Sequence, residues 1–212
     1  MLANTKAIQE VKHRMSGGER RAQIVTTAFD LFAQNGFRGT TTRELAHAVG
    51  VSEPVLYQHF SNKRDLYTAI VEHLIEQESH HFEDQLQAVL REEEVRPFLQ
   101  AFGELVLAWY LEDQRLPRLL MFSALEGHEL AQIWHERAMA LFFAPVNEKV
   151  DRLVEAGQLK KMEPTVLTRS FMSMVAHYGL VTIFFKLPQF DLSREETVAR
   201  FVELFLSGAE RR

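Results

Sequence analysis

The chain of 212 residues contains no cysteine. Disulfide bonds and zinc sites built on cysteine are therefore excluded. The sequence also has no run of about 18 apolar residues that could cross a membrane, and it opens without the apolar stretch of a secretion signal. These absences predict a soluble, cytoplasmic protein in a reducing compartment, with no membrane partner.

The sequence motifs of common enzyme classes are also missing. There is no G-x-S-x-G, H-E-x-x-H, G-x-G-x-x-G or phosphate-binding loop, and the Ser, His and Asp residues are scattered without diagnostic spacing. His80 and His81 are adjacent and point apart on a helix, while His128 and His135 lie too far apart to chelate an ion unaided. We therefore expect no enzymatic activity, no catalytic residue, no cofactor and no bound metal.

Only six prolines occur, and alternating β-branched runs are nearly absent, which favours an all-α protein. Apolar residues recur at helical spacing in about nine segments, and 46% hydrophobic residues are enough for a sizeable core. Pro145 should kink or split the seventh segment. The predicted helices span approximately residues 18–35, 42–49, 53–59, 63–90, 98–110, 116–125, 128–156, 164–185 and 193–208.

Residues 40–67 carry the clearest local signals in the chain. Thr41 and Glu44 have the spacing of a capping box at a helix start. Gly50 can take the left-handed conformation that ends a helix, and Ser52 is expected to cap the next one. Two short helices joined by such a turn are typical of a helix-turn-helix, which reads the DNA major groove.

The charge is unevenly distributed along the sequence. Residues 1–64 hold nine Lys and Arg against five Asp and Glu, a net charge of +4. The whole chain carries −5, so residues 65–212 carry −9. A basic N-terminal part on an acidic remainder is what a DNA-binding module with a separate regulatory domain would show.

This arrangement resembles the TetR family of bacterial transcriptional regulators. The resemblance covers roughly residues 20–70, and the run from Leu56 to Lys63 is its most specific part; Arg64 departs from it, because an acidic residue often stands there. It implies a dimeric, all-α repressor that binds a palindromic operator in double-stranded DNA and is released by a small-molecule effector. The residues that carry it are Thr42, Glu44-Leu45-Ala46, Gly50-Val51-Ser52, Leu56-Tyr57, His59-Phe60, Lys63 and Leu66.

Three parts of the chain follow from this interpretation. Residues 1–16 form a basic N-terminal arm, either a flexible tail or a segment that touches phosphates or the minor groove. Residues 17–66 form the helix-turn-helix DNA-binding domain, and residues 67–212 form the ligand-binding and dimerisation domain.

The outward positions of the short second helix of the motif should contact DNA. Gln58 could pair with adenine and Val55 could meet a thymine methyl group. Tyr57, His59 and Lys63 are expected at phosphates, although the two aromatic residues could instead pack within the domain. The complete set of predicted DNA-binding residues is Thr42, Arg43, Ser52, Glu53, Val55, Tyr57, Gln58, His59 and Lys63.

Large aromatic and polar side chains in the C-terminal part predict an effector site. Single aromatic residues there are more often core than pocket, but their collective excess suits an apolar or amphipathic ligand, such as a fatty acyl compound, an aromatic or a cationic drug. The predicted ligand-binding residues are Trp109, Tyr110, Phe122, Glu126, His128, Trp134, Phe142, Phe143, His177 and Tyr178.

The last two predicted helices carry more apolar positions than a small domain needs, which predicts a homodimer through them. The alternative is that these helices only close the core of one subunit. A different function also stays open, namely an architectural or partner-regulated DNA-binding protein without a small-molecule effector. The apolar positions are Val166, Phe171, Val175, Leu180, Phe184, Val198, Phe201, Val202 and Phe205.

Overall fold

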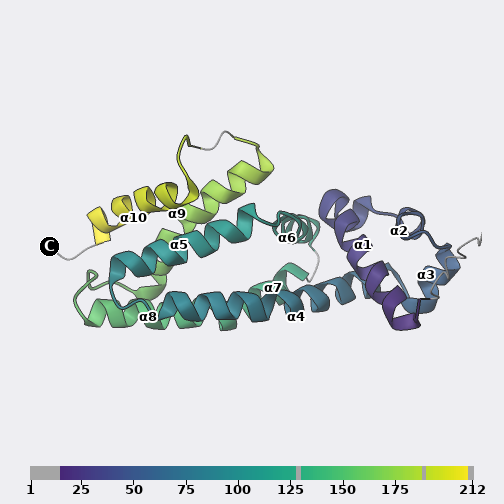
Figure 1. Ribbon diagram of the computed structural model, residues 1–212, viewed down its shortest axis with the longest axis horizontal. Helices are drawn as coiled ribbons and strands as arrows, with labels where there is room; N and C mark the ends of the chain where they lie inside the picture. The colour runs from purple at the N-terminus through teal and green to yellow at the C-terminus, as the bar shows by residue number, and fades with distance from the viewer. Residues whose placement is uncertain (1–14, 128–129, 188–189, 210–212) are drawn as a thin grey trace, which may run out of the picture.

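The computed structural model describes residues 15–127, 130–187 and 190–209, and this part of the chain contains ten α-helices, one π-helical turn and no strand. The molecule is elongated, with α1 to α3 at one end and the long α4 running from them along the rest (Figure 1). The prediction of an all-α protein is confirmed. Nearly all of the predicted basic arm lies outside the described residues.

The helices follow the predicted order. They are α1 (Gly17–Gly39), α2 (Thr42–Val49), α3 (Glu53–His59), α4 (Lys63–Leu90), α5 (Val95–Leu111), α6 (Arg115–Glu126), α7 (Leu130–Ala138), α8 (Ala144–Glu155), α9 (Pro164–Phe184) and α10 (Arg194–Ala209). The predicted seventh helix is split, because the π-helical turn Met139–Phe143 separates α7 from α8 just before Pro145. A proline has no N–H to continue the helical hydrogen-bond pattern, which explains the break at this point.

Side-chain caps fix where several helices begin. Thr41 and Glu44 form a reciprocal capping box, with the Thr41 N–H donating to Glu44 Oε2 at 2.7 Å and the Glu44 N–H donating to Thr41 Oγ1 at 3.2 Å. Asn62 accepts a hydrogen bond from the Asp65 N–H at the start of α4. These polar groups satisfy backbone N–H groups that have no partner inside the helix, so the starts of α2 and α4 are set locally.

Gly36 does not end α1, as the sequence suggested, but interrupts it. Its backbone has φ 73° and ψ 175°, and a short helical turn continues to Gly39. Residues with a Cβ are strained at this φ, so the interruption needs a glycine. Thr40 Oγ1 donates to the Gly36 carbonyl at 2.9 Å, which gives one freed carbonyl a partner.

The buried apolar side chains form two clusters, which we call the head core and the body core. The head core joins α1, α2, α3 and the first turns of α4, but it also contains Leu116 and Leu119 of α6. The head core therefore extends past residue 66 and takes in one helix from the C-terminal part; the domain boundary at 66/67 stays a prediction.

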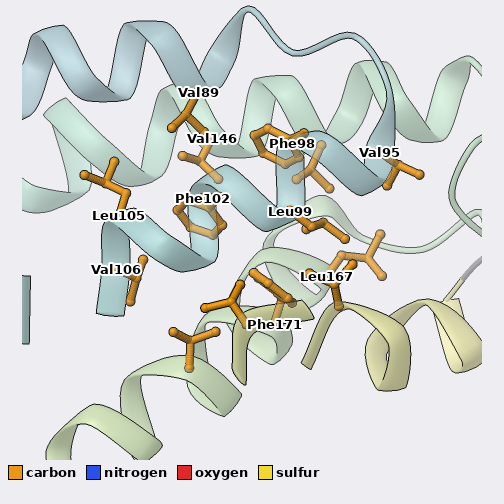
Figure 2. Close-up of a cluster of buried hydrophobic side chains, with 14 of the residues drawn as sticks. Val89, Val95, Phe98, Leu99, Phe102, Leu105, Val106, Val146, Leu167 and Phe171 are labelled. Carbon is orange, nitrogen blue, oxygen red and sulfur yellow. The ribbon is translucent and has the colours of Figure 1, made fainter. Parts of the chain in front are cut away.

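The body core is built around α5. Figure 2 shows Phe102 of α5 between Val146 of α8 and Phe171 of α9, with Phe98 one turn earlier on α5 in the same cluster. Phe102 lies 6.0 Å from Phe171 between ring centroids, and Gly103 lets α10 approach so closely that a Cβ there would be 2.5 Å from Val198 Cγ1. Interior packing this dense makes α5 a rigid support for the helices around it.

The predicted dimer surface on α9 and α10 divides into two sets of residues. Phe171, Val175, Val198 and Val202 are buried in the body core of the single chain. The second set is at least partly exposed: Val166 is 48% exposed, and Leu180, Phe184, Phe201 and Phe205 are half-buried. Leu204, which was not among the predicted residues, is 65% exposed on α10. The buried set therefore closes the core of one subunit, and pairing of the second set with another copy stays a prediction.

Candidate nucleic-acid interface and ligand-binding region

The turn between α2 and α3 has the geometry of a helix-turn-helix. Gly50 ends α2 in the left-handed conformation, with φ 77° and ψ 33°, and its N–H is hydrogen-bonded back to Ala46 and His47. Leu45 of α2 and Leu56 of α3 are buried in the head core. The two helices are thus held by one apolar seam, and the residues on the opposite side of α3 are left for a partner.

The outward face of α3 presents polar side chains to solvent. Tyr57 is 46% exposed, Gln58 and Ser52 are exposed, and Val55 and His59 are half-buried. A protein helix that enters the major groove needs such a face of donors, acceptors and small apolar groups. The structure places all five on or beside this face of α3, and their contacts to DNA stay a prediction.

Ser52 occupies the N-cap position of α3, but its hydroxyl makes no capping hydrogen bond. The expected cap is therefore wrong. Two local features explain this: Pro54 has no N–H to offer, and the Val55 N–H donates to the Ser52 carbonyl oxygen at 3.0 Å. The exposed hydroxyl of Ser52 consequently remains available for an external partner.

Thr42 and Glu53 connect the starts of the two helices of the motif. Thr42 Oγ1 donates a hydrogen bond to Glu53 Oε2 at 2.9 Å. This contact gives Glu53 a role that the sequence did not reveal, since its carboxylate anchors α2 to α3. Arg43, the next residue of α2, is exposed beside them.

Lys63 at the start of α4 points inward. Its Nζ donates a hydrogen bond to the carbonyl oxygen of Phe37, and the same ammonium lies 4.2 Å from the centroid of the Phe37 ring. Partial burial lowers the pKa of Lys63 from its ordinary value, against the opposing attraction of Glu126 and Glu44. The contact with phosphate stays a prediction, and a DNA phosphate would have to compete with Phe37 for this side chain.

Hydrogen bonding and burial shift the pKa values of two other ionisable groups in the head. The Thr41 N–H and hydroxyl donate to the carboxylate of Glu44 and hold the pKa of Glu44 below its ordinary value. Burial raises the pKa of Tyr67 on α4 to about 12. Tyr67 is therefore uncharged at neutral pH, packed edge-on against Phe32 in the head core.

Three of the predicted ligand-binding residues lie together where head and body meet. Trp109 of α5 packs against Trp134 of α7, with ring centroids 6.2 Å apart, and Tyr110 packs edge-on against Trp109 at 4.8 Å. Both tryptophans are half-buried and pack against the head core. Burial raises the pKa of Tyr110, so its hydroxyl stays protonated at neutral pH.

Four other predicted ligand residues lie in the π-helical turn and on α9. Phe142 and Phe143 pack edge-on against each other in the π-helical turn, with Phe142 against the body core. Tyr178 of α9 uses its hydroxyl to accept from the Phe190 N–H at 3.1 Å, and its neighbour His177 is exposed. Phe142 and Tyr178 pack against the body core, as Tyr110 does.

Phe122 and Glu126 lie on α6 against the head rather than within the body. Glu126 accepts two hydrogen bonds from the Arg38 N–H, at 3.2 and 3.3 Å. His128 lies outside the described residues. All ten ligand-binding assignments stay predictions, since the sequence indicates which helix holds a residue but not the direction of its side chain.

Three arginines on the junction between α1 and α6 were missed by the sequence analysis. Arg115 pairs with Asp30 at 2.9 Å, Arg118 Nε donates to the Ala33 carbonyl at 3.1 Å, and Arg38 Nη2 donates to the Glu126 carbonyl at 3.3 Å. These three acceptors lie 85 or 88 residues away in sequence, and two of them are backbone oxygens, while Arg115 also pairs with Asp113 two residues before it. No local pattern could have indicated the three contacts between α1 and α6.

Two negative findings apply to the residues described. Among them, no helix is long and apolar enough to span a membrane. Nor does any group of three or more His, Asp and Glu side chains in this part of the protein lie close enough to hold a metal ion.

Comparison with known proteins places the motif in a family. The sequence profile described as "Bacterial regulatory proteins, tetR family" matches residues 24–70. The "HTH-type transcriptional activator FasR" of Mycolicibacterium smegmatis is 42% identical over 60 residues, which are 28% of this chain and 27% of FasR. The chain thus aligns with only about a quarter of that relative.

Longer matches are weaker in identity. The "HTH-type transcriptional regulator AcrR" of Shigella flexneri is 28% identical over 206 residues, covering 92% of this chain and 93% of AcrR. The crystal structure of the transcriptional regulator FadR from Bacillus subtilis in complex with stearoyl-CoA superposes with a TM-score of 0.65 at 16% identity, covering 88% of this chain and 98% of that one. The second likeness shows a shared fold. The tetR profile falls on the helix-turn-helix of this structure, so residues 24–70 form a DNA-binding domain of the kind found in the bacterial regulatory proteins of the tetR family, and the remaining helices share the fold of solved TetR-family structures.

Proposed function

We propose that the protein is a ligand-responsive transcriptional repressor that binds operator DNA through α2 and α3. The observation that carries this proposal is the outward face of α3, where exposed Ser52, Tyr57 and Gln58 flank a buried Leu56 within the region matched by the tetR profile. Side chains on such a face can reach base edges while the first turns of α2 and α4 approach phosphates. The relatives are named as regulators of transcription, and enzymatic activity is not part of the proposal.

The proposed operator is palindromic, because the protein would bind it as a homodimer. Val166 of α9 and Leu204 of α10 are exposed apolar residues on the two helices that the sequence singled out for pairing. A two-fold axis between two copies would present two identical heads to two half-sites, about one helical turn or a multiple of it apart.

The proposed effector is a small apolar or amphipathic molecule. The half-buried Trp109, Tyr110 and Trp134 support this, because they form an aromatic group on the body side of the head core. A ligand held there would press on helices that also contact the head. FadR from B. subtilis was crystallised with stearoyl-CoA, which makes this compound a reasonable first probe.

Selection of bound sequences from random duplex DNA tests the DNA-binding part of the proposal. The purified full-length chain should enrich a two-fold symmetric site, and its affinity should fall steeply with salt as phosphate counterions are released. Light scattering should give the mass of a dimer. A monomer that binds no duplex even at low salt would overturn the proposal.

Effector binding is tested with the operator so obtained. Stearoyl-CoA is titrated into the protein–operator complex, and melting temperature is followed in parallel; an effector raises the melting temperature and releases DNA. A reporter gene behind the operator then distinguishes a repressor from an activator. If stearoyl-CoA and a panel of aromatic and cationic compounds all leave both readouts unchanged, a DNA-binding protein without a small-molecule effector becomes the better interpretation.

A further inference from the structure

The C-terminal turn of α6 is fastened to the C-terminal end of α1. Both carboxylate oxygens of Glu126 accept from the Arg38 N–H, at 3.2 and 3.3 Å, and Arg38 Nη2 donates back to the Glu126 carbonyl at 3.3 Å. Hydrogen bonds to an ionised carboxylate are about twice as strong as neutral ones. This pair therefore holds the last turn of a body helix to the head by side chain and backbone together.

Gly36 makes the approach of α6 possible. A Cβ at this position would lie 2.7 Å from Glu126 Oε1 and 2.9 Å from Phe122 Cδ1, closer than real side-chain contacts allow. The interruption of α1 at Gly36 also changes the direction of the short turn that follows, which brings the Arg38 N–H within hydrogen-bond distance of Glu126. The kink at Gly36 and its missing side chain thus both allow the last turn of α6 to pack against the end of α1.

Other contacts hold α6 along the length of α1. Arg118 Nε donates to the Ala33 carbonyl, Arg115 pairs with Asp30, and Leu116 and Leu119 are buried in the head core. Arg115 and Asp30 are about half exposed, so their ion pair contributes little. Glu126 differs from them because it accepts a backbone N–H at the point where α1 is interrupted.

The junction also reaches the helix that carries the head into the body. Lys63, at the start of α4, donates to the Phe37 carbonyl beside Arg38. Ser123, one turn before Glu126, accepts from the Ala131 N–H at 3.0 Å, which fastens α7 to α6. The ends of α1, α4, α6 and α7 therefore meet within a few residues of Glu126.

From this geometry we infer that Glu126 is a positioning residue, which fixes the angle of the head on the body and thereby the operator spacing that the dimer accepts. The inference rests on the proposed function as a dimeric operator-binding protein. A rigid junction allows the two α3 helices only one separation and one rotation. Since inserting a base pair changes both the distance and the helical phase of two half-sites, a rigid dimer must deform the DNA to bind a wrong spacing.

The test compares operators whose half-sites are moved together or apart by one and two base pairs. The wild-type protein should lose about tenfold or more in affinity at each altered spacing, because twisting DNA into register costs free energy. With Glu126→Ala, operator affinity should depend much less on half-site spacing, while the sequence preference within each half-site stays the same. Glu126→Gln, which retains one acceptor for the Arg38 N–H, should lie between them.

Glu112→Gln is the matched control. It also removes one carboxylate, but the partner of Glu112 is Arg194 of α10, at the body side of the molecule. Its spacing profile should equal that of the wild type. The inference is wrong if Glu126→Ala shows the wild-type dependence of affinity on spacing. It is also wrong if Glu126→Ala weakens binding equally at all spacings and lowers the melting temperature, because Glu126 is then only a structural residue.

A second measurement needs no DNA. Because the chain has no cysteine, spin labels can be attached at Ala48→Cys in α2 and Glu155→Cys in α8, both exposed positions. The distance distribution between head and body should be narrow in the wild type and broader with Glu126→Ala. An unchanged distribution would overturn the inference even if the protein bound no operator, so failure of the proposed function and failure of this junction are distinguished.

Discussion

The hydroxyl of Thr42 donates a hydrogen bond to the carboxylate of Glu53, 2.9 Å away, and so joins the first turn of α2 to the first turn of α3. Both residues belong to the surface expected to face DNA. An acidic side chain is unfavourable beside phosphate, yet this one holds the two helices of the motif in register. Glu53 therefore contributes to the shape of the interface at some electrostatic cost to binding.

Replacement of Glu53 separates these two effects. Glu53→Gln keeps an oxygen that can accept from Thr42 but removes the negative charge, so operator affinity at low salt should rise by a few-fold with little change in melting temperature. Glu53→Ala removes the acceptor as well and should lower the melting temperature. Fluorescence anisotropy and thermal denaturation measure both. Weaker binding of Glu53→Gln would mean that the carboxylate accepts from a base.

Gln58 is expected to read one base pair. Its exposed side chain on α3 can pair with adenine through two hydrogen bonds, so Gln58→Ala should cost about 1–3 kcal/mol of discrimination at one position of each half-site. Binding to a panel of single-base operator variants measures this. Uniform weakening across the panel would contradict base reading and place Gln58 at a phosphate.

Lys63→Met tests which partner that side chain serves. Methionine keeps the apolar stem but loses the hydrogen bond to Phe37 and the contact with its ring, so unfolding free energy should fall by about 1–2 kcal/mol. If Lys63 also reaches a phosphate, the salt dependence of operator binding should lose about one counterion. Lys161→Met, on an exposed body position, is the control. Unaltered stability with a reduced salt slope would make Lys63 a phosphate ligand alone.

The capping box at Thr41 predicts a pH effect. Hydrogen bonds from Thr41 lower the pKa of Glu44, so the stability they provide is present above the pKa of Glu44 in the unfolded chain and is lost as pH falls through its lower value in the folded one. Thr41→Val removes the hydroxyl, which should move the Glu44 pKa upward and lower the melting temperature at neutral pH. Carboxyl NMR titration of Glu44 is the measurement. An unmoved titration would show that the hydroxyl does not stabilise the charged form.

Local signals in the sequence were sufficient for the elements of the DNA-binding motif. The Thr41–Glu44 box and the left-handed Gly50 define α2 within the predicted bounds, because each depends only on residues a few positions apart. Ser193 and Glu196 have the same spacing and form an equivalent box before α10, where the Ser193 N–H donates to Glu196 Oε2 at 2.8 Å. Short-range hydrogen bonds of this kind can be read from spacing alone.

Contacts between distant segments could not be predicted in this way. Glu126 was expected at a ligand, but its acceptor atoms face Arg38, 88 residues away in sequence. Lys63 was expected at DNA, but Phe37 offers it a carbonyl oxygen and an aromatic face. In each case the polar or charged group has more than one chemically suitable partner, and only the packing of α6 and α4 against α1 determines which one it meets.

The π-helical turn Met139–Phe143 carries one residue more than a regular helical turn would hold. Each residue of an α-helix advances the chain by about 100° around its axis, so this single addition sets the rotation of α8 relative to α7. Gain or loss of one residue here would rotate Phe142 and Phe143 to another side of the α7–α8 segment. The packing of the head core would not change. A one-residue insertion or deletion at this turn would therefore reorient side chains inside the body and leave the DNA-facing residues of α3 unchanged.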